Sequence, residues 1–262
     1  MKPIYGVGDI HGYLDQLDHA LALIEADGGP DAEIVFVGDY TDRGPDSRGV
    51  IQRLLDGVAA GRPWHVLRGN HDRMFTRFVR DGTAQDPMIK SGKGWLHTAL
   101  GGPMTLQSYG ALDGFDHPDG GGGDAVLRNG LDPIPAQSRT QLVSLAQTAV
   151  PEAHLEFLEQ RPLMHVTDDL LFVHAGIRPG IPLAKQTEED LIWIRDRWLD
   201  DPRDHGRLVV HGHTALDHPV HHGNRVNIDG GAGYGRALVP VVFEGRDVWT
   251  LTNIGRKPLV PE

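Results

Sequence analysis

The sequence predicts an α/β fold, and three observations support that prediction. Short apolar segments alternate with amphipathic helical segments from the start of the chain to about residue 80. Further strand-like segments occupy the C-terminal third, and 262 residues suffice for one large domain with a sizeable core. Because repeated strand–helix units favour a sheet with helices packed on it, we expect a single domain spanning residues 1–262.

The first half of the chain supplies these strands and helices in alternation. Ile4–Val7, Ile34–Val37 and His65–Leu67 are short apolar runs with the length of buried strands. Leu14–Ala26 places leucines and an isoleucine on one helical face. A second helix is expected over Ser47–Ala60, because Ser47 is a good N-cap and an apolar stripe follows it.

A segment from about residue 81 to residue 136 interrupts this pattern with glycine, proline and polar residues. It offers little apolar material for a core of its own, so we expect an inserted cap or mobile loop rather than a second domain. Regular structure resumes after it. The expected elements are helices at Ser138–Ala149 and His154–Gln160, strands at Leu170–Val173 and Leu208–Val210, and a closing antiparallel set at Val226–Ile228, Leu238–Phe243 and Val248–Leu251.

Composition argues against several classes of function. The formal net charge of -11 disfavours general attraction to nucleic acid, although it leaves room for a local basic pocket. The chain has no cysteine, so a metal would have to be bound through oxygen and imidazole. It also shows neither a signal-peptide pattern nor an apolar run of about 18 residues, so we expect a cytoplasmic protein without membrane association.

Five short motifs rich in potential metal ligands each follow a predicted strand. Open α/β sheets build sites at the C-terminal ends of their strands, so this placement favours a common site. Taken singly each motif is weak evidence, since a His-Ala-Gly segment is more often a turn than a ligand. The motifs are Gly8-Asp9-Ile10-His11-Gly12, Gly38-Asp39-Tyr40-Thr41-Asp42-Arg43-Gly44, Gly69-Asn70-His71-Asp72, His174-Ala175-Gly176 and His211-Gly212-His213-Thr214.

Together the motifs supply Asp, His, Asp, Asn, His and His, which is enough for two divalent metal ions. Two ions about 3.5–4 Å apart need one bridging carboxylate, and they lower the pKa of a shared water molecule. The mixture of nitrogen and oxygen ligands suits manganese, iron or zinc better than calcium. The alternative is that these are unrelated core and turn residues.

In these motifs the sequence resembles the calcineurin-like metallophosphoesterases, and specifically their phosphoprotein phosphatase branch. The resemblance covers residues 8 to 214 and implies a four-layer αββα sandwich with two mixed β-sheets. It also implies two divalent ions, with manganese expected and iron or zinc as alternatives, and a water or hydroxide bound to both metals as the nucleophile. The implied metal ligands are Asp9, His11, Asp39, Asn70, His174 and His213, with Asp39 bridging the two ions.

The same resemblance implies roles for residues that act on the substrate. His71 would be the general acid, oriented by Asp42, and the alternative role for His71 is a seventh metal ligand. Arg43 would grip the phosphate through its guanidinium fork, beside Asn70. Arg195 resembles the family's second phosphate-binding arginine, and the alternative is a surface ion pair with Asp196.

Three functions are consistent with these residues. Asp72, Gly44-Pro45-Asp46-Ser47 and Trp95–Gly110 resemble bacterial serine/threonine phosphatases and symmetrical diadenosine tetraphosphatases. We expect a phosphomonoesterase of the serine/threonine protein phosphatase type, acting on a phosphorylated protein or a small phosphoester. The alternative is a symmetrical diadenosine tetraphosphate hydrolase, in which Trp95, Tyr109 or Phe115 could stack on adenine or instead form a small cap core. A non-catalytic scaffold is disfavoured because every expected ligand is present.

Overall fold

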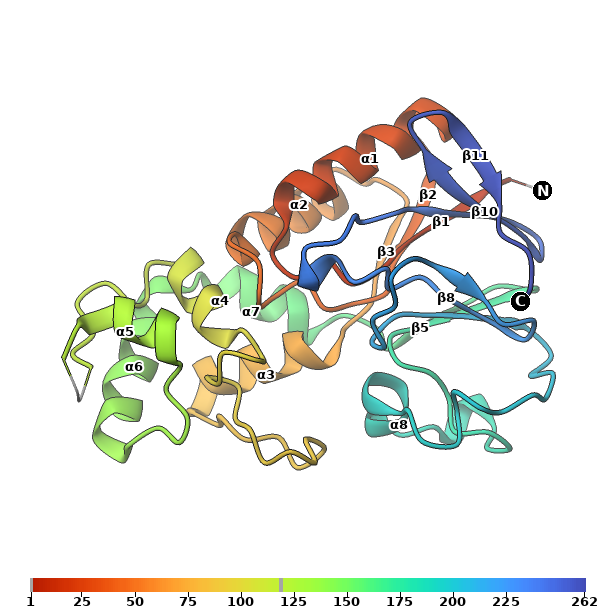
Figure 1. The fold of residues 1–262 in the computed structure, drawn as a ribbon. Coiled ribbons are helices and arrows are strands. Elements are labelled where there is room, and N and C mark those ends of the chain that lie inside the picture. Colours follow the sequence, from red (N-terminus) through yellow and green to blue (C-terminus); the bar gives the residue numbers. More distant parts are fainter. Residues whose placement is uncertain (1, 118–119) are drawn as a thin grey trace.

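The computed structural model describes residues 2–117 and 120–262, and two β-sheets stack face to face within them (Figure 1). Helices α1 (Leu14–Gly28) and α2 (Ser47–Ala59) cover the outer side of one sheet, and α8 (Glu188–Trp193) covers the outer side of the other. This arrangement is the predicted four-layer αββα sandwich. Residues 118 and 119 of the predicted insert lie outside the described residues.

Both sheets are mixed. One half of the first sheet is parallel and the other half antiparallel, whereas the second sheet has parallel strands at its centre and an antiparallel strand at each margin. The first sheet has the order β11-β10-β9-β1-β2-β3, and the second has the order β4-β5-β6-β8-β7. The strands are β1 (Ile4–Val7), β2 (Glu33–Phe36), β3 (Trp64–Val66), β4 (Met164–Val166), β5 (Leu170–Val173), β6 (Leu208–His211), β7 (Val220–His221), β8 (Arg225–Asn227), β9 (Val241–Glu244), β10 (Asp247–Thr252) and β11 (Gly255–Pro258).

Three clusters of buried apolar side chains hold the layers together. Strand residues alternate between the two faces of a sheet, so Ile34 and Phe36 pack under the helices while Val35 faces the other sheet. Val35 joins Phe172 and other aliphatic side chains in the cluster between the sheets. The third cluster packs α8 against the outer face of the second sheet. The strands β1, β2, β5 and β6 therefore have buried residues on both faces, which explains their nearly continuous apolar sequences.

The remaining helices form a lobe beside the sandwich (Figure 1). They are α3 (Asn70–Asp81), α4 (Gly102–Ser108), α5 (Gly122–Asn129), α6 (Ala136–Ala149) and α7 (Glu152–Glu159). Trp95, Leu106 and Val126 are fully buried and belong to the same apolar cluster as the helices on the first sheet. The two short helices of the 81–136 segment therefore pack into a core that they share with the sandwich, rather than into a core of their own.

Two expectations require correction. Asp46 rather than Ser47 caps α2, since the Asp46 carboxylate accepts a hydrogen bond from the Gly49 amide at 2.7 Å. The closing antiparallel set is split, because β8 pairs with β6 in the second sheet while β9 and β10 belong to the first. The sequence reading also missed α3 and α8. Among the described residues, none of the helices is both long enough and apolar enough to cross a bilayer.

Candidate dinuclear metal centre

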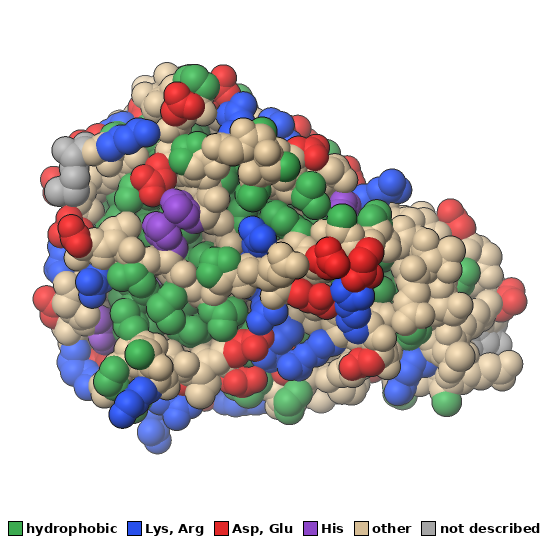
Figure 2. Space-filling model, turned by 180° about the vertical axis from the view of Figure 1, so that it is seen from behind, with side chains coloured by type: hydrophobic (Ala, Val, Ile, Leu, Met, Phe, Trp, Pro, Cys, Tyr) green, Lys and Arg blue, Asp and Glu red, His purple; other side chains and the backbone are tan. Residues whose placement is uncertain are grey.

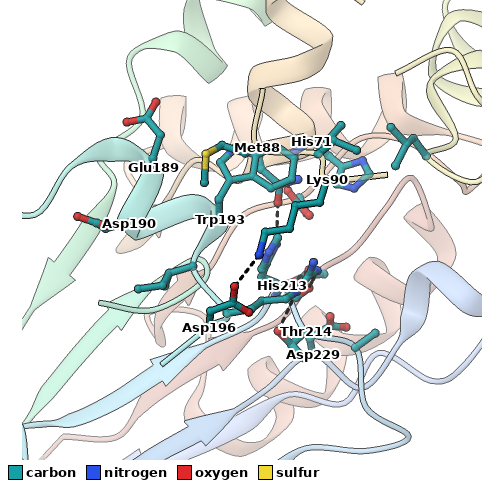
Figure 3. Close-up of a pocket in the computed structure, with 18 of the residues that line it drawn as sticks. His71, Met88, Lys90, Glu189, Asp190, Trp193, Asp196, His213, Thr214 and Asp229 are labelled. Carbon is teal, nitrogen blue, oxygen red and sulfur yellow. Dashed lines mark hydrogen bonds and ion pairs between the residues drawn. The ribbon is translucent and has the colours of Figure 1, made fainter. Parts of the chain in front are cut away.

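The five ligand-rich motifs follow β1, β2, β3, β5 and β6, and they meet at one end of the sandwich. β1, β2 and β3 are parallel neighbours in one sheet, and β5 and β6 are parallel neighbours in the other. Their carboxyl ends therefore lie at corresponding edges of the two sheets. The motifs form the floor of a cleft of about 1450 Å³ whose lining includes Asp39, His71 and His213 (Figure 3).

Asp39 lies at the centre of this arrangement. Its carboxylate is 3.8 Å from His11 Nε2 on one side and 3.4 Å from His174 Nε2 on the other. Potential ligand atoms accordingly fall into two groups that share Asp39, one with His11 and His71 and one with His174 and His213. A carboxylate with two oxygens in such a position can bridge a pair of ions.

The other predicted ligands are joined to the same cluster. Asn70 Oδ1 lies 2.9 Å from His174 Nε2 and 2.8 Å from His213 Nδ1. Asp9 accepts a hydrogen bond from the His213 amide, with N–O distances of 3.1 and 3.2 Å. The structure thus brings all six predicted ligand residues together. The structure also places His71 in the ligand group that contains His11. The position of His71 is therefore compatible with a general acid and with a seventh metal ligand.

Backbone hydrogen bonds fix which ring nitrogen of two histidines faces the cluster. His11 Nδ1 lies 2.7 Å from the Thr41 carbonyl, and His174 Nδ1 lies 2.9 Å from the Val37 carbonyl. A carbonyl can only accept, so each Nδ1 must carry a proton and donate it. In a neutral ring this leaves Nε2 without a proton, as metal-binding histidines require, although His11 Nε2 accepts a hydrogen bond from Arg43 Nη1 at 2.6 Å in this structure.

The backbone is strained where these side chains leave the strands. His11, Asp39, Asp42, Arg43 and His213 have φ values of 48°, 57°, 74°, 67° and 64°, which is the left-handed region that residues with a Cβ rarely adopt. Strained residues of this kind persist only where the surrounding structure holds them, and they cluster at functional sites.

Asp72 provides much of that support. Its carboxylate accepts hydrogen bonds from the backbone amides of Asp39, Tyr40 and Gly69, each at 2.9 Å. Gly69 is required at this point for space, because a Cβ there would collide with the Asp39 carboxylate and amide. The sequence reading used Asp72 only as a marker of the bacterial relatives and missed this structural role.

The electrostatics of the cluster fit a bound cation. Burial raises the pKa values of Asp9 and Asp39, and the nearby negative charge of Asp229 raises that of Asp9 further. His213 Nε2 is buried and has no hydrogen-bond partner among residues 2–117 and 120–262. Divalent ions would neutralise the carboxylates and satisfy an otherwise unpaired imidazole nitrogen.

Asp229 was missed by the sequence reading, although its signal was present. It is buried, lines the cleft and follows β8 in an Asp-Gly-Gly segment, as the recognised motifs follow their own strands. Burial raises its pKa as well. It contributes a further buried carboxylate beside Asp9.

His71 and Asp42 form a buried pair next to the ligand groups. His71 Nδ1 lies 2.6 Å from Asp42 Oδ2, and the Asp42 oxygens also accept hydrogen bonds from Trp95 Nε1 at 2.8 Å and Thr105 Oγ1 at 2.7 Å. Burial lowers the pKa of His71 to about 3 and raises that of Asp42 to about 7, so one proton is shared within the pair between these values. The hydrogen bonds from Thr105 and Trp95 of the insert lower the pKa of Asp42, but the effect of burial outweighs them.

The insert also contacts Arg43 and contains the aromatic residues considered for adenine stacking. The Arg43 amide donates to the Gly101 carbonyl at 3.3 Å. Trp95, Tyr109 and Phe115 are all buried, and the first two pack against Phe75. They form the core of the lobe, so of the two roles considered for these aromatics the structure shows the packing role.

Arg195 reaches the cluster from the loop after α8. Its guanidinium donates to the His213 carbonyl at 2.9 Å and to Thr214 Oγ1 at 3.4 Å. Asp196, the alternative partner, instead pairs with Lys90 at 2.5 Å, and Figure 3 shows these two side chains meeting across the cleft. Arg195 is therefore directed into the cleft.

Comparison with known proteins agrees with this geometry. Proteins from Bacillus thuringiensis and Bacillus cereus, named asymmetrical bis(5'-nucleosyl)-tetraphosphatase PrpE, are 25% identical over 98% of this chain and 96% of their own length. A solved structure provisionally named diadenosine tetraphosphatase is 22% identical, with a TM-score of 0.62 over 95% of this chain and 93% of its own. A cold-active protein tyrosine phosphatase has the same TM-score of 0.62 at 16% identity, over 100% of this chain and 79% of its own. The family model for calcineurin-like phosphoesterases matches residues 2–238, and the chain therefore belongs to that family.

Proposed function

We propose that this chain hydrolyses phosphoester and phosphoanhydride bonds at the centre built around Asp39. The observation that carries the proposal is the convergence of two ligand groups on one buried carboxylate at the floor of a cleft. Asp9, His11, Asp39, Asn70, His174 and His213 would hold two divalent ions, for which we favour manganese. Such ions, when bound, polarise a phosphoryl group and lower the pKa of a water molecule.

Arg43 and Arg195 would bind the phosphate oxygens that face away from the ligand groups. The Arg43 guanidinium lies between His11 and His71, with Nη1 2.6 Å from His11 Nε2 and Nη2 3.2 Å from His71 Nε2. Its guanidinium stacks 4.7 Å from the ring centroid of Tyr234, which fixes the plane of the fork. A planar fork of this kind suits phosphate oxygens, and Asn70 can add its amide N–H as a further donor.

His71 would protonate the leaving oxygen as it departs. Its Nε2 faces the cleft while Asp42 holds Nδ1, and this orientation is the one that a general acid needs. Trp95 and Thr105 position Asp42 from the insert, so the lobe contributes indirectly to proton donation.

The size and charge of the cleft favour a dinucleoside polyphosphate as substrate. Its volume of about 1450 Å³ exceeds the roughly 300–1,000 Å³ of most small-molecule pockets, so it has room for a long ligand. Seven basic and six acidic side chains line the cleft despite the acidic chain, although Lys90, Arg178, Arg203 and Arg236 are each paired with an aspartate. The names of the curated relatives support the same substrate class.

The cleft walls also offer contacts for a nucleoside. Trp193 lines the cleft and adds the flat apolar surface of its indole, although its Nε1 atom is buried. Met88 and Ile181 add exposed apolar surface to the walls. A nucleobase offers a flat apolar face, so it complements this surface.

A phosphomonoesterase of the serine/threonine protein phosphatase type is the second candidate function. The sequence motifs favour it, and a single phosphate at the cleft floor could contact Arg43 and His71 together. A phosphorylated side chain would leave the basic walls of the cleft unused.

The first prediction ranks the substrates. Purified protein supplied with manganese should hydrolyse diadenosine tetraphosphate with a kcat/KM about tenfold or more above that for a phosphoserine peptide or p-nitrophenyl phosphate, which corresponds to about 1.4 kcal/mol of transition-state binding. Product analysis should then distinguish symmetrical cleavage to two ADP from asymmetrical cleavage to ATP and AMP. A higher kcat/KM for the phosphopeptide would favour the second candidate instead.

The second prediction concerns metal removal. Dialysis against a chelator should abolish turnover of every substrate, and added manganese should restore it at least in part, because the carboxylates and imidazoles alone cannot activate water at neutral pH. Elemental analysis of the dialysed protein is the necessary control. Full turnover by protein shown to be free of metal would refute the proposed mechanism.

The third prediction isolates proton donation. His71→Asn should retain bound metal but lower kcat by about 10²–10⁴ for an alkyl phosphate, whose leaving group needs a proton. The loss should be much smaller for p-nitrophenyl phosphate, because its leaving group departs without one. Metal loss from His71→Asn, or equal defects on the two substrates, would show that His71 is a ligand rather than the acid.

A further inference from the structure

A second group of potential ligands lies at the margin of the sandwich, away from the cleft. Glu33 begins β2, His65 lies in β3 and His165 lies in β4, so the group joins edge strands of both sheets. Glu33 precedes Asp39 by six residues along an extended segment, which separates the two groups by roughly 20 Å at the usual rise per strand residue. The three residues do not line the cleft.

Strand register explains why these three side chains meet. His65 pairs with Val35 and His165 pairs with Phe172, and both partners belong to the apolar cluster between the sheets. Paired residues point to the same face of a sheet, so His65 and His165 face one another across the open margin of that cluster. Glu33 shares the face of Val35, two residues further along.

The distances bring the three ligand atoms close to one point. His65 Nε2 lies 3.0 Å from Glu33 Oε1, and His165 Nε2 lies 4.0 Å from the same oxygen. One ligand atom from each residue falls within 4.8 Å of the other two. The two imidazole rings stack with centroids 3.8 Å apart and planes 26° apart.

His165 is the incompletely satisfied member of the group. Its Nε2 is buried and finds no hydrogen-bond partner in residues 2–117 and 120–262. Burial and the neighbouring His65 lower the pKa of His165, so its imidazole stays neutral and keeps a lone pair available. A polar nitrogen in this position beside an apolar cluster costs free energy unless something binds it.

We propose that Glu33, His65 and His165 form a separate binding site for one divalent transition-metal ion, with zinc as the favoured occupant. Two imidazoles and one carboxylate are a common zinc ligand set, and they leave a fourth position for water. Among first-row divalent ions, sites built from nitrogen and oxygen ligands bind zinc more tightly than manganese, which favours zinc as the occupant here.

Binding requires a local adjustment that the site permits. Stacked rings direct their lone pairs nearly parallel, so one imidazole must turn about its Cβ–Cγ bond to converge on an ion. The side chains of His65, Glu33 and His165 are 36%, 30% and 22% exposed, which leaves space for that rotation and for entry of the ion. A bound ion would then connect β2 and β3 to β4 and so clasp the two sheets together.

The test uses zinc as the probe on the whole protein loaded with manganese. Wild-type protein should bind one more zinc equivalent per chain than His165→Gln or His65→Gln, as measured by elemental analysis after desalting. Zinc should also raise the unfolding midpoint of the wild type by roughly 2–4 °C, since a ligand specific for the native state stabilises it, and this rise should vanish in both variants. His19→Gln removes an exposed histidine from α1 and should behave as the wild type.

Two measurements keep the outcome decisive. The variants should retain wild-type turnover with manganese, which shows that they fold and that the cleft is intact. In NMR spectra of protein labelled with ¹⁵N-histidine, zinc should shift the ring-nitrogen signals of His65 and His165. These signals are assigned by their absence from the spectra of the two variants. Equal zinc stoichiometry in the wild type and both variants, or zinc that leaves these two rings unshifted, would overturn the proposal.

Discussion

The buried carboxylate of Asp39 is the constraint on which the functional end of this molecule depends. It lies between imidazoles from different strands, and it is the residue common to the two ligand groups. Its left-handed backbone is held by Asp72, which lies in the first turn of α3, and by the absence of a side chain at Gly69. The start of one helix, the ends of two strands and the position of one carboxylate are therefore coupled. A substitution at Asp39, Asp72 or Gly69 would therefore disturb both ligand groups of the centre.

The insert makes direct hydrogen bonds to residues of this centre, whereas a segment that only covered the cleft would not. Trp95 and Thr105 donate to both oxygens of Asp42, and Gly101 accepts from the Arg43 amide. Asp42 and Arg43 are thus supported from the insert, whereas the bridging position of Asp39 is supported from Asp72 in α3. Variation in the insert could alter substrate choice and acid strength together while leaving metal binding intact.

Much of the sandwich was predictable because its strands are buried on both faces. β1 and β5 have the predicted bounds, since three consecutive buried residues in β1 and four in β5 belong to clear apolar runs. The split of β8 from β9 was not predictable, because strand pairing depends on contacts far apart in sequence. The α3 pattern was present in Met74, Phe75, Phe78 and Val79, but the ligand motif that starts the helix hid it. The proposed ligands could be recognised because each follows a strand. The Trp95–Asp42 contact could not, since 53 residues separate the partners without any repeated pattern.

The shared position of Asp39 is tested most directly by counting bound metal in Asp39→Asn. If one carboxylate serves both ions, elemental analysis of this variant should show that both are lost, whereas Asp9→Asn, which alters one side of the cluster, should retain an ion. Circular dichroism of both variants should match the wild type, so that metal loss cannot be attributed to unfolding. Asp39→Asn protein that folds and still holds two ions per chain at wild-type affinity would contradict the central role assigned to Asp39.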